Sequence, residues 1–273
     1  MLISSPMSNQ YNFTGKKVKS NKLADHTSTG LKTQLGEENL SIIEKIYKLG
    51  KQEGVETYIF GGGVRDILIG KKPHDIDVIV TGDAITFTQA LKENYKDVFH
   101  SVKLKHKVKR AVAYSKTTDV DIVPLHPNGD RITDKNQLRR ALYTKSSQSD
   151  YKMNSMFIKV GENENGSLKL KLIDIFDAKK DLKKNKLSVT KSLDKQKNPV
   201  QGMRGLRFLQ RYDMKLEPNA KDWIKECIQQ PHPKDISYRL RLIKEMYKYL
   251  TQDKNIFKTI KNIIDFKLLK MFI

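Results

Sequence analysis

Two carboxylates, Asp75 and Asp77, stand two residues apart in an apolar, β-branched stretch. Side chains alternate along extended backbone, so both would project from the same face of a buried strand. Like charges at that spacing repel each other, and unpaired charge is costly beside apolar neighbours. A divalent cation resolves the conflict, and carboxylate oxygens are ligands that Mg²⁺ prefers. The pair predicts a magnesium site, with a solvent-facing strand edge as the alternative.

Three consecutive glycines, Gly61, Gly62 and Gly63, precede these carboxylates, and Arg65 follows the run. A glycine-rich turn from a strand into a helix directs backbone N–H groups at an anion and lets a phosphate approach closely. A glycine triplet alone is more often an ordinary turn. In one strand-turn-helix-turn-strand unit with Arg65 and the paired carboxylates, it predicts the phosphate cradle and metal site of a nucleotidyltransferase.

A second metal ion would need a third carboxylate from a neighbouring strand. Asp119 and Asp121 are again two residues apart on one face of a predicted strand, so alternation does not separate them. We favour Asp121, because apolar residues flank it on both sides. The expected chemistry activates a primer 3′-hydroxyl for attack on an α-phosphate, while the second ion carries the charge of the triphosphate.

The hydrophobic pattern predicts the elements that position these residues. Helices are predicted for residues 37–54, 64–70, 83–95 and 134–145, and strands for 58–60, 76–80, 98–104, 110–114 and 120–125. Residues 153–176 are predicted to form a β-hairpin with a polar tip at 161–166, and the chain turns helical beyond residue 198. The fold class is therefore α+β, with a nucleotide-binding domain followed by a helical domain and a boundary near 190–200.

The composition of the 273-residue chain indicates a polyanionic partner. It has 52 Lys+Arg against 31 Asp+Glu, a net charge of +21, which suits RNA, although a lysine-rich surface is the plainer alternative. No apolar run approaches the ~20 residues that span a bilayer, and the opening MLISSP is too short for a signal-peptide core. We expect a cytoplasmic protein with no membrane partner. Cys227 is the single cysteine, so no disulfide partner is expected.

The chain resembles a known family through an ordered set of motifs: GGGVRD, LIG, DIDVIVTGDA, VDIV, DYKMNSM, LIDIFDAKKDL and NPVQGMRGLRF. They are similar to those of class II CCA-adding enzymes (tRNA nucleotidyltransferases) and bacterial poly(A) polymerases, in the DNA polymerase beta-like nucleotidyltransferase superfamily. The resemblance covers roughly residues 40–273. It implies a polymerase-beta-like head with a mixed sheet at residues 37–195, then a helical neck and the start of a body domain at 196–273. Residues 1–36 are expected to form a flexible basic arm.

The same resemblance implies an activity and a set of site residues. The activity is template-independent addition of AMP and/or CMP, from ATP and/or CTP, to the 3′ end of a tRNA or another small RNA by a two-metal mechanism with Mg²⁺. Gly61, Gly62 and Arg65 would hold the nucleotide, Asp75 and Asp77 would bind magnesium, and Asp121 falls at the third acidic position. Asp150 and Asn154 fall in the R-R-D-x-x-x-N motif, Arg204 matches the second arginine of the neck motif D-P-x-R-x-x-R, and Arg241 and Glu245 resemble its later R-x-x-x-E-L element.

The chain departs from the family where the family carries cations and reads the base. Gln148 and Ser149 replace the two arginines of the first motif, and His126 replaces an arginine after the third carboxylate. Asn198 and Gln201 replace an Asp and Arg that read the nucleobase edge. An Asp–Arg pair presents fixed acceptors and donors, whereas Asn and Gln each present both kinds, so base selection could be relaxed, changed or lost.

Three hypotheses follow. The first is an active RNA nucleotidyltransferase of the CCA-adding or poly(A) type. The second is a catalytically impaired homologue that still binds RNA, favoured by the lost charges. The third is a nucleotidyltransferase that modifies a protein or a small molecule. Because the resemblance ends about where the family's body domain begins, we do not expect tRNA selectivity to follow from it.

Overall fold

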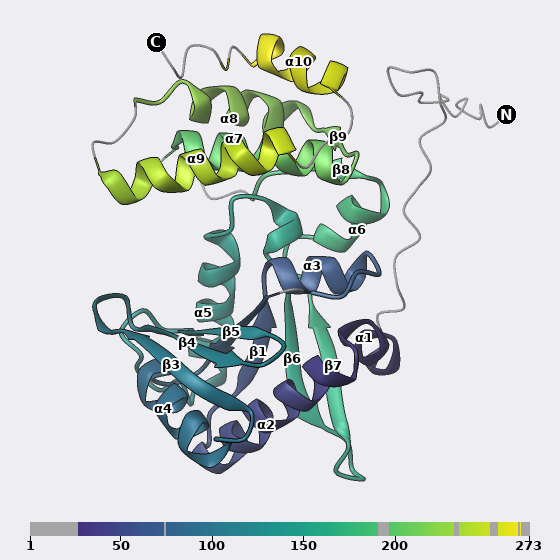
Figure 1. Cartoon of the computed structure of the whole chain (residues 1–273). Helices are drawn as coiled ribbons and strands as arrows, with labels where there is room; N and C mark the ends of the chain where they lie inside the picture. The colour runs from purple at the N-terminus through teal and green to yellow at the C-terminus, as the bar shows by residue number, and fades with distance from the viewer. Residues whose placement is uncertain are drawn as a thin grey trace, which may run out of the picture.

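The computed structural model describes residues 27–73, 75–190, 197–231, 235–251, 256–266 and 268. A mixed seven-stranded sheet forms the lower part of the molecule, and a layer of helices lies above it (Figure 1). The strand order is β3-β4-β5-β2-β1-β6-β7. All neighbouring strands are antiparallel except β2 and β5, which run parallel. The expected mixed sheet and helical C-terminal part are confirmed.

The bounds of the elements agree closely with the hydrophobic pattern. The strands are β1 Thr57–Phe60, β2 Ile76–Val80, β3 Phe99–Lys105, β4 Arg110–Ser115, β5 Asp119–Pro124, β6 Phe157–Glu162 and β7 Leu168–Ile173. The helices of this part are α1 Ser28–Leu35, α2 Glu37–Glu53, α3 Gly62–Leu68, α4 Ala84–Asn94, α5 Lys135–Ser147 and α6 Ala178–Lys183, with the 3₁₀ turns η1 His106–Val108 and η2 Lys152–Asn154. The helical layer comprises α7 Pro199–Arg211, α8 Pro218–Ile228, α9 Ile236–Thr251 and α10 Ile256–Asp265.

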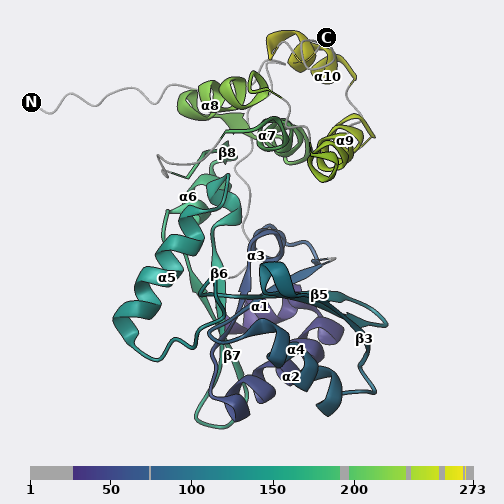
Figure 2. The same ribbon diagram turned by 90° about the vertical axis from the view of Figure 1, so that its left-hand side faces the viewer.

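The two faces of the sheet are covered unequally. Alternating residues such as Val78 and Ile122 join a large apolar cluster with α2 and α4, while Ile79 joins a smaller cluster with Leu142 of α5. Figure 2 shows α2 and α4 on one side of the sheet and α5 standing on the other. Residues Asp77 and Asp121 alternate with the first set, so both face the side of α5.

Part of the expected flexible N-terminal arm forms a helix. Residues 28–35, predicted as part of a flexible arm ending at residue 36, form helix α1. Leu31 and Leu35 are fully buried, and the hydroxyl of Ser28 accepts a hydrogen bond from the backbone of Leu170 at 2.9 Å. Two leucines one turn apart gave this helix an apolar face that the surrounding polar residues obscured in the sequence. The rest of the predicted arm, residues 1–26, lies outside the described residues.

The head and the helical layer are joined by β8 Lys186–Leu187 and β9 Lys215–Leu216, which pair in parallel. Helix α7 packs against both α8 and α9 and contacts β8, so it is the central element of the upper layer. No helix in the described ranges is long and apolar enough to cross a membrane.

Candidate functional site

Asp77 and Asp121 are direct neighbours on the two parallel strands. The register pairs Asp77 of β2 with Asp121 of β5, and both side chains are half-buried. Asp119, the alternative third carboxylate, is exposed at the start of β5. Paired residues of adjacent strands point to the same face, so two carboxylates from separate parts of the sequence meet at one edge of the sheet.

Asp75 lies outside the strand, which corrects the expectation that both carboxylates sit on it. Strand β2 begins at Ile76, and Asp75 occupies an exposed bend before it. Pairing with β1 ends at the Phe60–Asp77 pair, because Gly61 then turns the chain into α3. Asp75 has no strand partner at that point, so it stays near solvent while Asp77 is drawn inward.

The environment of Asp77 disfavours its negative charge. Burial raises the pKa of this carboxyl; Arg110 opposes the shift and Asp75 adds to it, while Lys145 and Arg65 also lower the pKa. Desolvation outweighs these cations, so the ionised carboxylate is held at an energetic cost. A further positive charge beside Asp77 would relieve it.

Asp121 is bound by an arginine from the next strand. The Nε and Nη2 atoms of Arg110, at the start of β4, donate to the two carboxylate oxygens of Asp121 in a fork. Among the described residues, no group of three or more His, Cys, Asp or Glu side chains is arranged to hold a metal ion. The arginine therefore neutralises the third carboxylate in this structure.

The glycine turn lies beside these carboxylates. Gly61 has φ 73° and ψ −128°, a backbone conformation that a side chain would strain, and its N–H donates to the carbonyl of Met156 at 3.2 Å. A Cβ at Gly61 would lie 3.7 Å from Oδ2 of Asp77, and α3 begins at the next residue, Gly62. The turn thus brings the start of α3 against the carboxylate edge.

Arg65 is engaged by protein groups on every side. Its Nε and Nη2 donate to Asp66 at 2.9 and 3.0 Å, and its Nη1 donates to Oδ1 of Asn154 at 2.7 Å. The guanidinium also lies over the rings of Phe208 and Tyr212 of the helical layer, 5.3 and 5.0 Å from their centroids. Arg65 and Asn154 therefore connect the glycine turn, η2 and α7.

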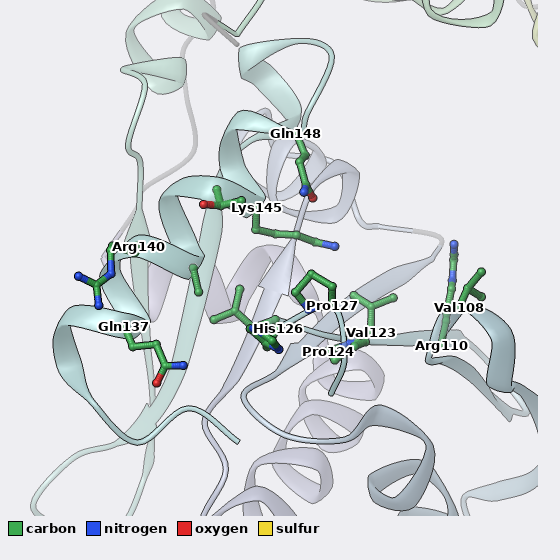
Figure 3. Close-up of a pocket in the computed structure, with 13 residues that line it drawn as sticks. Val108, Arg110, Val123, Pro124, His126, Pro127, Gln137, Arg140, Lys145 and Gln148 are labelled. Carbon is green, nitrogen blue, oxygen red and sulfur yellow. The ribbon is translucent and has the colours of Figure 1, made fainter. Parts of the chain in front are cut away.

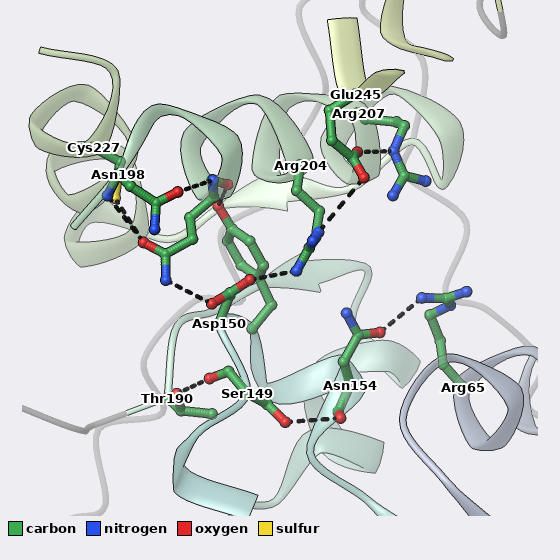
Figure 4. Close-up of polar contacts among 12 residues, drawn as sticks. Arg65, Ser149, Asp150, Asn154, Thr190, Asn198, Arg204, Arg207, Cys227 and Glu245 are labelled. Carbon is green, nitrogen blue, oxygen red and sulfur yellow. Dashed lines mark hydrogen bonds and ion pairs between the residues drawn. The ribbon is translucent and has the colours of Figure 1, made fainter. Parts of the chain in front are cut away.

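Asp150 forms the centre of a second polar group, between the head and α7 (Figure 4). Nη1 of Arg204 donates to its Oδ2 at 2.6 Å, and Nε2 of Gln201 donates to its Oδ1 at 2.9 Å. Arg204 also lies 3.8 Å from Glu245 of α9, which accepts a 2.7 Å hydrogen bond from the buried Arg207. These charges compensate one another within the protein.

The two residues at the base-reading positions cap helix α7. The side chain of Asn198 accepts from the backbone N–H of Gln201 at 3.2 Å, and the side chain of Gln201 accepts from the backbone N–H of Asn198 at 3.0 Å. This is a capping box, with Pro199 at the first helical position. The sequence carried its signal, an Asn-Pro followed by Gln three residues after the cap, which we interpreted only as a base-reading pair.

A family model matches the part of the chain that carries this arrangement. Residues 57–188, which carry the glycine turn, the three carboxylates and Asp150, match the poly A polymerase head domain. This stretch is similar to the head domain of class II CCA-adding enzymes and bacterial poly(A) polymerases, the family that the motifs resemble. This is a family of nucleotidyltransferases.

Named relatives and solved structures agree with this assignment. The A-adding tRNA nucleotidyltransferase of Aquifex aeolicus is 29% identical over 207 residues, covering 73% of this chain and 24% of the relative. Poly(A) polymerase I of Haemophilus influenzae is 25% identical over 205 residues, covering 68% and 41%. The Thermotoga maritima CCA-adding enzyme, solved in complex with tRNA, superposes with a TM-score of 0.70 at 25% identity, covering 92% of this chain and 56% of that one. The chain spans less than half the length of these curated relatives.

Two cations near the carboxylates of this poly(A) polymerase-like head were missed in the sequence. Arg110 is the first residue of β4, next to the strand that carries Asp121, so strand pairing could have suggested it. Lys145 lies on α5, and only the packing of that helix on the sheet brings it near Asp77. No local motif marks it.

Arg110 and Lys145 line a cavity of about 690 Å³ on the α5 side of the sheet. Its other lining residues include the polar Gln148, Arg140 and His126 and the apolar Val123, Pro124 and Pro127, and Figure 3 shows His126 close to the two prolines. Gln148 and His126, which stand where the family carries arginines, both line this cavity.

Proposed function

We propose that this protein is a template-independent RNA nucleotidyltransferase that adds AMP and/or CMP from ATP and/or CTP to an RNA 3′ end. The observation that carries the proposal is the alignment of Asp77 with Asp121 on adjacent parallel strands, with the Gly61 turn against them. The names of the relatives, A-adding and CCA-adding tRNA nucleotidyltransferases and poly(A) polymerase I, support the substrate class. The primer would be a tRNA or another small RNA, reached in the cytoplasm.

The carboxylates have the chemistry of a magnesium site. Burial and repulsion from Asp75 raise the pKa of Asp77, and a hard divalent cation would offset both effects. Asp75 and Asp77 would hold Mg²⁺, and Asp121, whose carboxylate Arg110 now binds, is the candidate for a second ion. When bound, magnesium supplies positive charge that stabilises the triphosphate and lowers the pKa of the attacking hydroxyl.

The remaining site residues would position the nucleotide. Gly62, the first residue of α3, would present its backbone N–H to the phosphates, while Gly61, whose own N–H donates to Met156, would form the turn at a φ of 73° that favours glycine. Arg65 and Asn154 would hold that turn in place through their 2.7 Å hydrogen bond. The contribution of these groups is orientation, which removes much of the entropic cost of bringing a hydroxyl in line with a phosphate.

Base selection would be weak. Asp150, Arg204, Asn198 and Gln201 line the junction with α7, but the amide of Gln201 already contacts Asp150 and the backbone of Asn198. Of these two amides, only the Nδ2 group of Asn198 has no hydrogen-bond partner among the described residues. A single free donor cannot distinguish adenine from cytosine as sharply as a fixed donor and acceptor pair.

A primer-extension assay tests the proposal. The full chain is incubated with Mg²⁺, each of the four labelled nucleoside triphosphates and a tRNA that lacks its 3′ end, and the products are sequenced. We expect extension with ATP or CTP, and no extension by the Asp75→Ala, Asp77→Ala double variant. A three-nucleotide CCA end indicates CCA addition, and a homopolymer indicates tailing. Absence of incorporation with every nucleotide and primer would refute the proposal, and label transferred to protein would indicate a different acceptor.

A catalytically impaired RNA-binding homologue is the second candidate. It is favoured by the fork between Arg110 and Asp121, which occupies the third carboxylate, and by the neutral residues Gln148 and Ser149. This candidate predicts RNA binding that weakens steeply with salt and no metal-dependent binding of nucleotide. Calorimetric titration with ATP or CTP, with and without Mg²⁺, separates the two, because metal-dependent nucleotide binding rules the second candidate out.

A further inference from the structure

Lys145 is a cation near Asp77 at the carboxylate edge, and it forms no direct ion pair among the described residues. It lies in the last turn of α5, is half-buried, and Figure 3 shows its amino group leaving the helix toward the cavity below the side chain of Gln148. Within the part of the chain that the structure describes, no acceptor receives a hydrogen bond from this amino group. A lysine held in this way is not an ordinary solvated surface residue.

The surroundings of Lys145 work against its positive charge. Burial lowers the pKa of its amino group, the neighbouring Arg110 lowers it further, and only Asp77 raises it. Arg110 faces the same space with a side chain that is 42% exposed, although its fork holds Asp121. Two cations converging on one partly desolvated space are stabilised when an anion lies between them.

The cavity beside these cations has the size and composition of an anion site. Its volume of about 690 Å³ is in the range of pockets that hold small ligands. Arg110, Arg140, Lys145 and His126 line it, and none of its lining residues within the described ranges is acidic. The carboxylates Asp77 and Asp121 lie outside the lining but adjoin it through Lys145 and Arg110. An anion bound here would therefore be next to the proposed reaction centre.

We propose that Lys145 and Arg110 together bind a phosphate group beside Asp77, making Lys145 a substrate-binding residue of this site. The inference rests on the proposed function, which supplies two phosphate sources, the triphosphate of the nucleotide and the backbone of the primer RNA. Lys145 lines the cavity with Arg110, whereas the polar group at Asp150 is formed with Arg204 and Gln201, so Lys145 would serve the phosphate and not the base.

Binding measurements on the full chain test this role. The variants are Lys145→Met, which keeps the aliphatic chain without the charge, Lys145→Arg, which keeps the charge, and Lys135→Met, an exposed lysine at the other end of α5. The probes are inorganic tripolyphosphate, titrated calorimetrically, and a fluorescent oligoadenylate RNA, followed by anisotropy. We expect Lys145→Met to weaken binding of one probe by about 10- to 100-fold, since a charged hydrogen bond is lost. Lys145→Arg should stay within about threefold of the parent protein.

The two probes, tripolyphosphate and RNA, distinguish the two possible sources of the phosphate. Loss of tripolyphosphate binding, with a raised KM for nucleotide, assigns the phosphate to the triphosphate. Weaker RNA binding, with a salt dependence that corresponds to about one fewer released counterion, assigns the phosphate to the primer backbone. The inference is overturned if Lys145→Met binds both probes like the parent, or if Lys145→Arg or Lys135→Met loses as much as Lys145→Met. Probe binding that depends on Lys145 in a protein that extends no RNA would refute the proposed function alone; extension with unchanged probe binding in Lys145→Met would refute only this inference.

Discussion

The carboxylate edge of the head and the junction with α7 are both rich in charge, but they differ in how that charge is satisfied. At the junction, Asp150 accepts from both Arg204 and Gln201, and Glu245 accepts from Arg207. At the edge, burial holds the pKa of Asp77 above its usual value. The charges of the junction are compensated within the protein, whereas a cation bound at the edge would stabilise the carboxylate of Asp77. Ligand binding energy should therefore be concentrated at the edge, and folding stability at the junction.

The largest effect should come from Asp77→Asn, which removes charge from the edge. We expect extension activity to fall about a thousandfold or more, because Asp77 is a proposed magnesium ligand and a bound metal contributes several kcal/mol of transition-state stabilisation. The midpoint of thermal unfolding should stay the same or rise, since the change removes a negative charge that burial disfavours. Initial rates of extension and a thermal melt measure the two quantities.

Asp119→Asn is the matched control, because Asp119 is exposed on the same strand as Asp121. It should leave both rate and melting midpoint close to those of the parent protein. A marked drop in the melting midpoint of Asp77→Asn would mean that Asp77 stabilises the fold, and the contrast between edge and junction would be lost.

The next largest effect should come from Glu245→Gln, which breaks the buried ion pair between α7 and α9. The Nε of Arg207 donates to Glu245 at 2.7 Å, and both side chains are about nine-tenths buried. Removing one partner leaves an uncompensated buried charge, so the free energy of unfolding should fall by about 3 kcal/mol. Urea denaturation measures the change.

Glu226→Gln provides the comparison, because Glu226 pairs with Lys197 at the surface. That variant should lose less than about 1 kcal/mol, as exposed ion pairs do. Equal losses in the two variants would show that the buried pair at the junction contributes no more to the free energy of unfolding than an exposed pair does.

The sequence was most informative about local structure and least informative about which polar groups satisfy one another. Helix α2 and its left-handed Gly54 cap, strand β2 and the hairpin of β6 and β7 follow from periodicity and turn residues, because those signals are local. Helix α1 was missed, since its two buried leucines are surrounded by polar residues.

At the site, the contacts that could not be predicted from the sequence are those that depend on tertiary packing. Asp75 and Asp77 were predicted as the pair, with Asp121 as a third carboxylate from a neighbouring strand; the strand register aligns Asp77 with Asp121, whereas Asp75 lies before β2. The packing of β4 places Arg110 on Asp121, and the packing of α5 brings Lys145 near Asp77. No sequence motif predicts either contact. The sequence contained the capping signal of Asn198 and Gln201, but we interpreted both residues only through the family motif, as a base-reading pair.

The smallest of the three effects concerns the contact on which the junction is built. A Cβ at Gly205 of α7 would lie 2.0 Å from Oη of Tyr151, a fully buried ring whose hydroxyl donates to the carbonyl of Gln201 at 2.9 Å. Gly205→Ala should therefore lower the free energy of unfolding by about 1 to 3 kcal/mol, as overpacking outweighs the helix propensity that alanine gains.

Gly161→Ala, whose Cβ would meet only the carbonyl of Lys169 at 3.9 Å, should be nearly neutral. Adding Tyr151→Phe to Gly205→Ala removes the atom that the methyl group meets first, so urea denaturation should show partial recovery. If Gly205→Ala is as stable as the parent protein, the packing of Tyr151 against α7 does not limit the stability of the junction. The junction and the carboxylate edge would then differ only in how their charges are satisfied.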